Sequence, residues 1–169
     1  MTSNSAVERA WALLEQVTDP EIPVVSIREL GILREVNERE GEIDVVITPT
    51  YSGCPAMGQI EDDVRTAMAA HPLQVNVRIR LAPAWSTDWI SDAAKDKLRA
   101  YGIAPPHTAQ AAERVVQFSA RSHDTGVRVA CPHCGSADTT ETSHFGSTAC
   151  KALYKCFACL EPFDYFKSY

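Results

Sequence analysis

The chain has 169 residues, of which 45% are hydrophobic and 22% charged, a balance typical of folded globular proteins and not of disordered chains. Its formal net charge is −6. Residues 127–169 hold four basic and four acidic side chains, so the acidic excess lies in residues 1–126. Neither part has the basic surface that binding to a phosphate backbone requires, and no nucleic-acid partner is expected.

The first 20 residues carry charged side chains at several positions and lack the apolar core of a secretion signal. No apolar run approaches the roughly 20 residues needed to cross a bilayer. We therefore expect a cytoplasmic protein with no membrane partner. In that compartment disulfides are disfavoured, so the six cysteines favour metal or redox chemistry.

The predicted elements begin with a helix over residues 6–17, where apolar residues recur at helical spacing before Pro20 excludes continuation. Residues 32–37 and 42–48 read as a β-hairpin that turns before Gly41. In the second strand, Ile43, Val45 and Ile47 share one face. A second helix is expected from Pro55 to about residue 70.

Residues 73–81 alternate between apolar and polar, which predicts a strand with one buried face formed by Val75, Val77, Ile79 and Leu81. Residues 88–101 read as a third helix capped by Asp88. The fold class is therefore α+β, in the order α-β-β-α-β-α, with the helices on one face of a small sheet. We expect this domain at residues 1–103, a linker at 104–126 with a short strand near residues 115–118, and a cysteine-rich module at 127–169.

The cysteine-rich module carries the strongest chemical signal in the chain, two CxxC pairs separated by 21 residues: Cys131, Cys134, Cys156 and Cys159. Four thiolates from two tight turns make a tetrahedral site suited to structural zinc, one ion per chain. About 40 residues rarely bury enough apolar surface to fold unaided, so the module should need its metal. A four-thiolate iron site stays an alternative, because the same ligands suit both metals.

Two other features of this module leave alternatives open. Cys150 is either a small buried thiol or a transient ligand for iron. Seven of the ten Phe and Tyr residues lie in 127–169, and some of them should cover the metal site. The end of the chain, Phe163-Asp-Tyr-Phe166, serves either as part of the module's core or as a docking surface for a partner.

Cys54 stands alone between Gly53 and Pro55, at the expected start of the second helix. The helix dipole and free N–H groups should stabilise its thiolate and lower its pKa. The hydroxyls of Thr50 and Ser52 are candidates for further hydrogen bonds to it. On chemistry alone, however, the favoured interpretation is an inert thiol that serves as a small hydrophobic residue, because lone cysteines are often buried.

The segments Asp19-Pro-Glu-Ile-Pro23, Leu30-Gly-Ile32 and Thr50-x-x-x-Cys54-Pro55, with later matches up to Ile103, resemble the MIP18 family, also called domain of unknown function 59. Members of that family are implicated in the assembly and transfer of iron–sulfur clusters. The resemblance implies that Cys54 is the signature cysteine and Asp19 the signature acid. It also implies a role for Thr50 around a transiently bound iron ion or cluster, and the resemblance of the C-terminal module described next extends that role to Cys150.

The C-terminal module, from Cys131-Pro-His-Cys-Gly to Glu161-Pro-Phe-Asp-Tyr-Phe166, is similar to the PaaD family, the D components of bacterial phenylacetyl-CoA epoxidase systems. This resemblance implies partners in that system, either its di-iron oxygenase or its iron–sulfur reductase. It implies an accessory protein for maturation of the oxygenase system, or a structural subunit, with no catalytic activity of its own. A bridging cluster between two Cys54 residues would require a homodimer. A di-iron catalytic role is disfavoured, because a helical di-iron site needs Glu-x-x-His pairs on long helices, and we expect no Glu-x-x-His pair in this chain.

Overall fold

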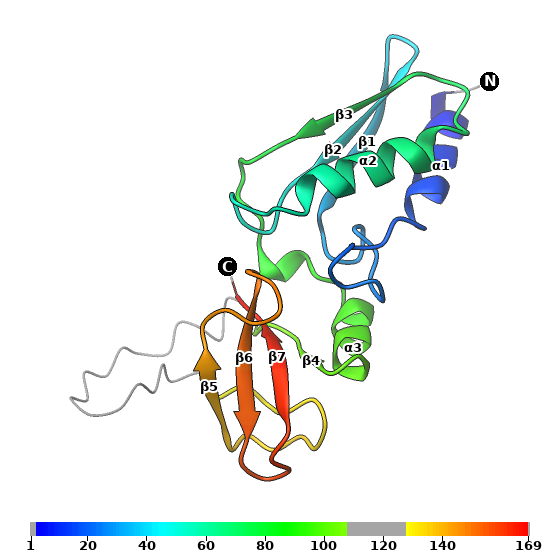
Figure 1. Cartoon of the computed structure of the whole chain (residues 1–169). Coiled ribbons are helices and arrows are strands. Elements are labelled where there is room, and N and C mark those ends of the chain that lie inside the picture. Colours follow the sequence, from blue (N-terminus) through cyan, green and yellow to red (C-terminus); the bar gives the residue numbers. More distant parts are fainter. Residues whose placement is uncertain (1–2, 108–127, 169) are drawn as a thin grey trace. The chain divides into compact units, whose positions relative to one another are not determined.

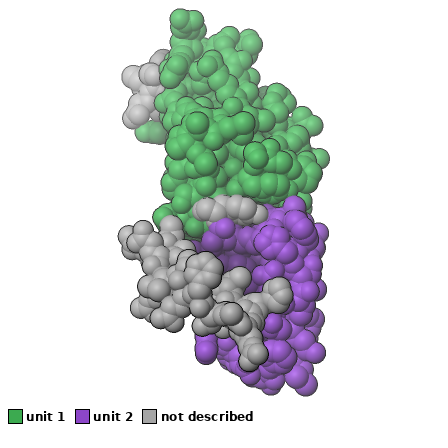
Figure 2. Space-filling view, turned by 90° about the vertical axis from the view of Figure 1, so that its left-hand side faces the viewer, with its two compact units in different colours: residues 1–97 green, residues 98–169 purple. Residues whose placement is uncertain are grey.

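A computed structural model describes residues 3–107 and 128–168, which divide into two compact units (Figures 1 and 2). Unit 1 comprises residues 1–97 and unit 2 comprises residues 98–169. Among the described residues, no helix is long and apolar enough to span a membrane. Residues 108–127, which hold most of the predicted linker and the short strand near 115–118, lie outside the described part of the chain.

Unit 1 is an α+β domain, as the sequence predicts, and its three-stranded sheet has the order β1-β2-β3 (Figure 1). Its elements are α1 (Ser3–Leu14), β1 (Leu33–Arg39), β2 (Glu42–Ile47), α2 (Met57–Met68), β3 (Val75–Ile79) and the 3-10 helix η1 (Thr87–Trp89). Strands β1 and β2 are antiparallel, and β3 is parallel to β2. Helix α3 (Asp92–Ala100) begins in unit 1 and ends in unit 2.

The β1–β2 hairpin closes through two residues of positive φ, Glu40 at 53° and Gly41 at 82°. Two consecutive positive φ values define the type I′ turn, whose twist matches that of the flanking strands. This turn sets the register that sends Ile43, Val45 and Ile47 into the core, where all three are fully buried. Helix α2 adds four buried residues to unit 1, among them Ile60.

Three details differ from the sequence predictions. Helix α2 begins at Met57, so Pro55 and Cys54 precede it. The start of α3 is capped by Ser91, whose Oγ accepts a hydrogen bond from the Ala94 N–H at 3.1 Å, because Asp88 belongs to the separate turn η1. The expected buried face of β3 is wrong, since Ile79 and Leu81 are 47% and 60% exposed at the edge of the sheet.

Unit 2 is built on a four-stranded sheet in the order β4-β7-β6-β5. The strands are β4 (Ile103–Ala104), β5 (Thr139–Ser143), β6 (Lys151–Cys156) and β7 (Pro162–Phe166). Strand β4 pairs with β7 in parallel, so Ile103 and Ala104 are part of the sheet that carries the cysteine pairs. The domain boundary at residue 103 stays a prediction.

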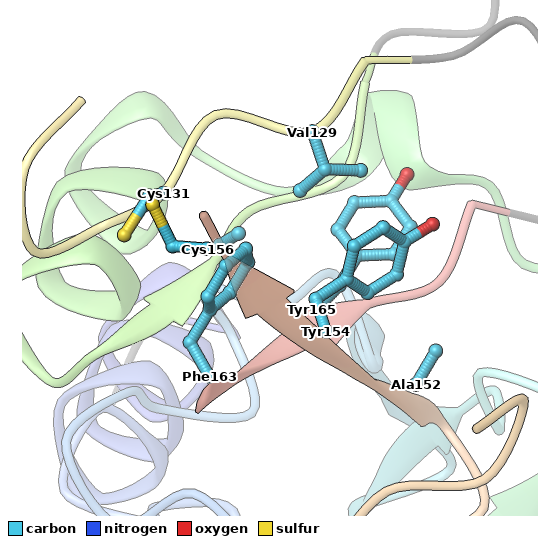
Figure 3. Packing of buried hydrophobic residues seen from close by; sticks show 8 residues of the cluster. Val129, Cys131, Ala152, Tyr154, Cys156, Phe163 and Tyr165 are labelled. Carbon is cyan, nitrogen blue, oxygen red and sulfur yellow. The ribbon is translucent and has the colours of Figure 1, made fainter. Parts of the chain in front are cut away.

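Three C-terminal aromatic residues, Tyr154, Phe163 and Tyr165, lie in the core of unit 2 (Figure 3), whereas Phe145 and Phe157 are exposed. Tyr154 stacks on Phe163 with ring centroids 5.8 Å apart and meets Tyr165 edge-on at 5.4 Å. Phe166 is 1% exposed. For the segment Phe163-Asp-Tyr-Phe166, the structure favours core packing over docking, because its three aromatic side chains are buried.

Candidate metal and cluster sites

The four cysteines of the CxxC pairs converge in unit 2. Their Sγ atoms all lie within 4.8 Å of one another. The Sγ of Cys131 is 3.7 Å from that of Cys159, and the Sγ of Cys134 is 3.6 Å from that of Cys156. Sulfur atoms bonded to one tetrahedral zinc at about 2.3 Å lie about 3.8 Å apart, so these residues fit a zinc ion.

Matching turns present the two pairs. After each second cysteine the chain adopts a positive φ, 76° at Gly135 and 67° at Leu160. The first cysteine of each pair donates its N–H across the turn, Cys131 to Ser136 O at 2.9 Å and Cys156 to Glu161 O at 3.0 Å. The N–H groups of Cys159 and Ala158 also face the Cys156 thiol and lower its pKa to about 7. The turn therefore favours the thiolate at Cys156. At Cys159 the Glu161 N–H lowers the pKa, but burial and the neighbouring thiols outweigh it and raise the pKa to about 12.

Asp19 forms a rigid turn in unit 1, as its sequence predicts. Its side chain is buried, and Oδ1 accepts hydrogen bonds from the N–H groups of Glu21 and Ile22, both at 2.9 Å. The Asp19 N–H donates to Val25 O at 3.0 Å. These bonds fix the position of the carboxylate.

Cys54 is half-buried in the turn that leads into α2. Its N–H donates to Tyr51 O at 3.2 Å, and its carbonyl oxygen accepts from the Met57 N–H at 3.4 Å. Thr50, four residues earlier, is also buried. The N–H groups of Ala56 and Met57, at the start of α2, also face the thiol.

The predicted fall in the pKa of Cys54 is wrong. Burial raises the pKa of this thiol; the Ala56 N–H opposes the change, but the carboxylates of Glu21 and Asp19 raise it further. The charge of Asp19 thus acts on Cys54, although the two residues lie far apart in the sequence. Sequence reasoning missed Glu21 as a member of this site, although it is the third residue of the quoted Asp-Pro-Glu motif.

The raised pKa predicts that Cys54 reacts slowly with iodoacetamide near neutral pH, because alkylation requires the thiolate. Replacing Glu21 with Gln removes one negative charge and should move the onset of alkylation to lower pH. The rate at pH 8 should rise a few-fold, since one pKa unit changes the thiolate fraction about tenfold. Mass spectrometry of the Cys54 peptide measures this rate. An unchanged pH profile of alkylation in Glu21→Gln would show that the charge of Glu21 does not act on Cys54.

Cys150 lies in unit 2 and is not one of the four clustered cysteines. It is 6% exposed, and its Sγ is 3.0 Å from Thr148 Oγ1. The structure thus places Cys150 as a small buried thiol, and a role in iron transfer stays a prediction.

The comparison with known proteins decides the family. Over 162 residues, the chain is 46% identical to an Escherichia coli (strain K12) protein that is provisionally named as the D component of 1,2-phenylacetyl-CoA epoxidase. The match covers 95% of this chain and 92% of that protein. This chain belongs to the PaaD family. Residues 116–167 match the PaaD zinc beta ribbon domain.

The first part of this PaaD family member has its own relatives. Residues 7–81 match the iron–sulfur cluster assembly protein family. The chain is 34% identical over 91 residues to the Bacillus subtilis Fe-S protein maturation auxiliary factor YitW, covering 52% of this chain and 88% of that protein. A crystal structure of a domain of unknown function 59 from Bacillus anthracis superimposes with a TM-score of 0.53 and 31% identity, covering 57% of this chain and 93% of that one.

The expectation of no Glu-x-x-His pair is wrong, because this spacing occurs in unit 2 at Glu141 and His144, whose Oε1 and Nδ1 lie 3.4 Å apart. Glu141 is on strand β5 and His144 follows that strand. The spacing therefore lies outside the helices, where the helical di-iron motif would place it.

Proposed function

We propose that this chain is a non-catalytic accessory protein of a phenylacetyl-CoA epoxidase system, which carries iron or an iron–sulfur cluster at Cys54 for an oxygenase component in the cytoplasm. The observation that carries the proposal is the half-buried thiol of Cys54 beside the carboxylates of Glu21 and Asp19. That thiol lies in the part of the chain related to Fe-S maturation factors, on a chain of the PaaD family.

The chemistry of Cys54 suits a cargo that must leave again. A single thiol supplies one of the four thiolates that an iron–sulfur cluster needs, so other ligands complete the set. Two Cys54 residues in a homodimer, or Cys150, are candidates for this. Because burial and two carboxylates raise the pKa of Cys54, binding iron must displace a proton. The free energy needed to remove this proton weakens the binding of iron to Cys54, and weak binding favours transfer to another protein.

The iron or cluster carried at Cys54 would be delivered to the oxygenase or to its iron–sulfur reductase. The four clustered cysteines of the zinc ribbon have a separate role, and we assign one structural zinc per chain to them. A four-thiolate iron site in the ribbon is the competing assignment.

One observation favours a structural subunit as the second candidate. Phe157 and Leu160 lie on the turn formed by the second cysteine pair and are 52% and 68% exposed. Apolar side chains at such a turn could dock on the oxygenase and stabilise it without handling metal.

The test is the iron and acid-labile sulfide content of the full chain after anaerobic reconstitution. The carrier proposal expects iron and sulfide in the wild type, loss of most of both in Cys54→Ser, and about one zinc in each. Ser52→Ala, at an exposed position in the same turn, serves as the matched control and should bind as the wild type does. Equal iron in wild type and Cys54→Ser would overturn the carrier proposal. Full epoxidase activity with Cys54→Ser would favour the structural role.

A further inference from the structure

Strand β3 has a free outer edge in unit 1 (Figure 1). Among the described residues, β3 pairs with β2 alone. The Arg80 N–H donates to Ile47 O, and Gln74 O accepts from the Ile43 N–H. Because bonding groups alternate along a strand, the N–H and C=O groups of Val75, Val77 and Ile79 point to the opposite side. This edge offers a row of backbone donors and acceptors.

One face of this edge is apolar. Ile79 is 47% exposed, and Leu81, two residues further on the same face, is 60% exposed. Folded chains usually protect an edge strand with charge, proline or a covering element, and exposed aliphatic residues at an edge favour association. A strand added beside β3 would cover both side chains.

The other face of the edge carries arginines held in place by acids of the neighbouring strands. Arg78 Nη2 is 3.2 Å from Oδ1 of Asp44, which is itself buried, and Arg80 Nη2 donates to Glu35 Oε2 at 3.0 Å. These four side chains and Ile79 line a hollow of about 250 Å³. A guanidinium carries five N–H donors, so one carboxylate partner leaves donors for a second anion.

We propose that the outer edge of β3 binds an extended segment of a partner protein in which acidic and apolar residues alternate. The segment would add as a fourth strand, with its acidic side chains toward Arg78 and Arg80 and its apolar side chains toward Ile79 and Leu81. A second copy of this chain is a poor occupant, because antiparallel pairing of two β3 strands brings like-charged arginines together on one face. The proposal does not depend on the role of Cys54.

The probe is a ten-residue peptide of alternating Glu and Val with blocked ends, and its partner is the isotope-labelled full chain. Amide chemical shifts should move most at Val75, Val77 and Ile79. A peptide of alternating Lys and Val has the same strand propensity and the opposite charge, so it should not bind.

Two variants separate the contributions of charge and backbone. The double variant Arg78→Gln/Arg80→Gln should weaken binding of the Glu/Val peptide about tenfold, because each exposed ion pair contributes up to about 1 kcal/mol. Arg65→Gln on α2, which removes an arginine of similar exposure, is the control and should bind normally. Val77→Pro removes an outward N–H but no bond to β2, and should abolish binding.

Several results would overturn the proposal. These are no saturable binding of the Glu/Val peptide, equal binding of the Lys/Val peptide, or equal affinity in the double arginine variant. Self-association of the chain that Val77→Pro removes would assign the edge to a second copy instead.

Discussion

Removal of the metal is expected to unfold unit 2 and leave unit 1 folded. The buried cluster of unit 2 includes two of the metal ligands, Cys131 and Cys156, which are 2% and 0% exposed. The remaining members are few: Ala104, Val129, Ala152, Tyr154, Phe163 and Tyr165. Such a core cannot offset the conformational entropy of the strands unaided, whereas zinc in such modules contributes roughly 10–16 kcal/mol of apparent binding free energy.

The chain provides separate probes for its two units. All three tryptophans, Trp11, Trp85 and Trp89, belong to unit 1. A strong chelator should therefore leave tryptophan fluorescence unchanged while amide protection is lost across β6 and β7, as hydrogen exchange with mass spectrometry measures. Far-ultraviolet circular dichroism should lose only the ribbon's contribution.

Two cysteine variants make the assignment specific. Cys156→Ser removes a ligand and should reproduce the effect of the chelator, with the zinc content falling from about one per chain to near zero. Cys150→Ser alters a buried cysteine outside the cluster and should keep its zinc and its exchange protection. Full protection of β6 and β7 in metal-free protein would contradict the metal's structural role. Iron in place of zinc would reverse the metal assignment.

Gly31→Ala is expected to destabilise unit 1 more than any ordinary surface substitution. Gly31 has a φ of 71°, a conformation that costs an L-residue about 1–2 kcal/mol. A Cβ there would lie 2.6 Å from Trp89 Cβ and 2.9 Å from the Trp89 carbonyl oxygen, which is backbone and cannot rotate away. Adding about 1–3 kcal/mol for overpacking gives a loss of at least about 2 kcal/mol.

The measurement is thermal unfolding followed by tryptophan fluorescence. For a domain of about 100 residues, each kcal/mol lowers the Tm by about 4–8 °C, so the expected fall is at least about 8 °C. Gly58→Ala makes the same chemical change in α2, where a Cβ meets nothing within 4 Å and the helix favours Ala by up to about 1 kcal/mol. Its Tm should stay the same or rise. Equal shifts in the two variants would refute the close approach of Gly31 to Trp89.

Features that depend on local spacing can be predicted from the amino-acid sequence alone. Two CxxC pairs are sufficient to predict a four-thiolate metal site, because each pair is a turn of fixed geometry that presents both thiols on one side. The hairpin with its turn at Gly41, and the alternation of Ile43, Val45 and Ile47, are equally local, since φ preferences and the period of a strand set them. The α+β class of unit 1 follows from the order of such elements.

Other features depend on residues that are distant in the sequence and come together only in the folded chain. The pKa of Cys54 rises because the fold buries the thiol beside Asp19 and Glu21, and no local pattern at a helix start contains these charges. The alternation of Val75 to Leu81 predicts a buried face, but within residues 3–107 and 128–168 β3 has a neighbouring strand on one side only, and Ile79 and Leu81 are exposed. Composition could not assign the C-terminal aromatics to a core or to a docking surface, because burial depends on which strands pack over them.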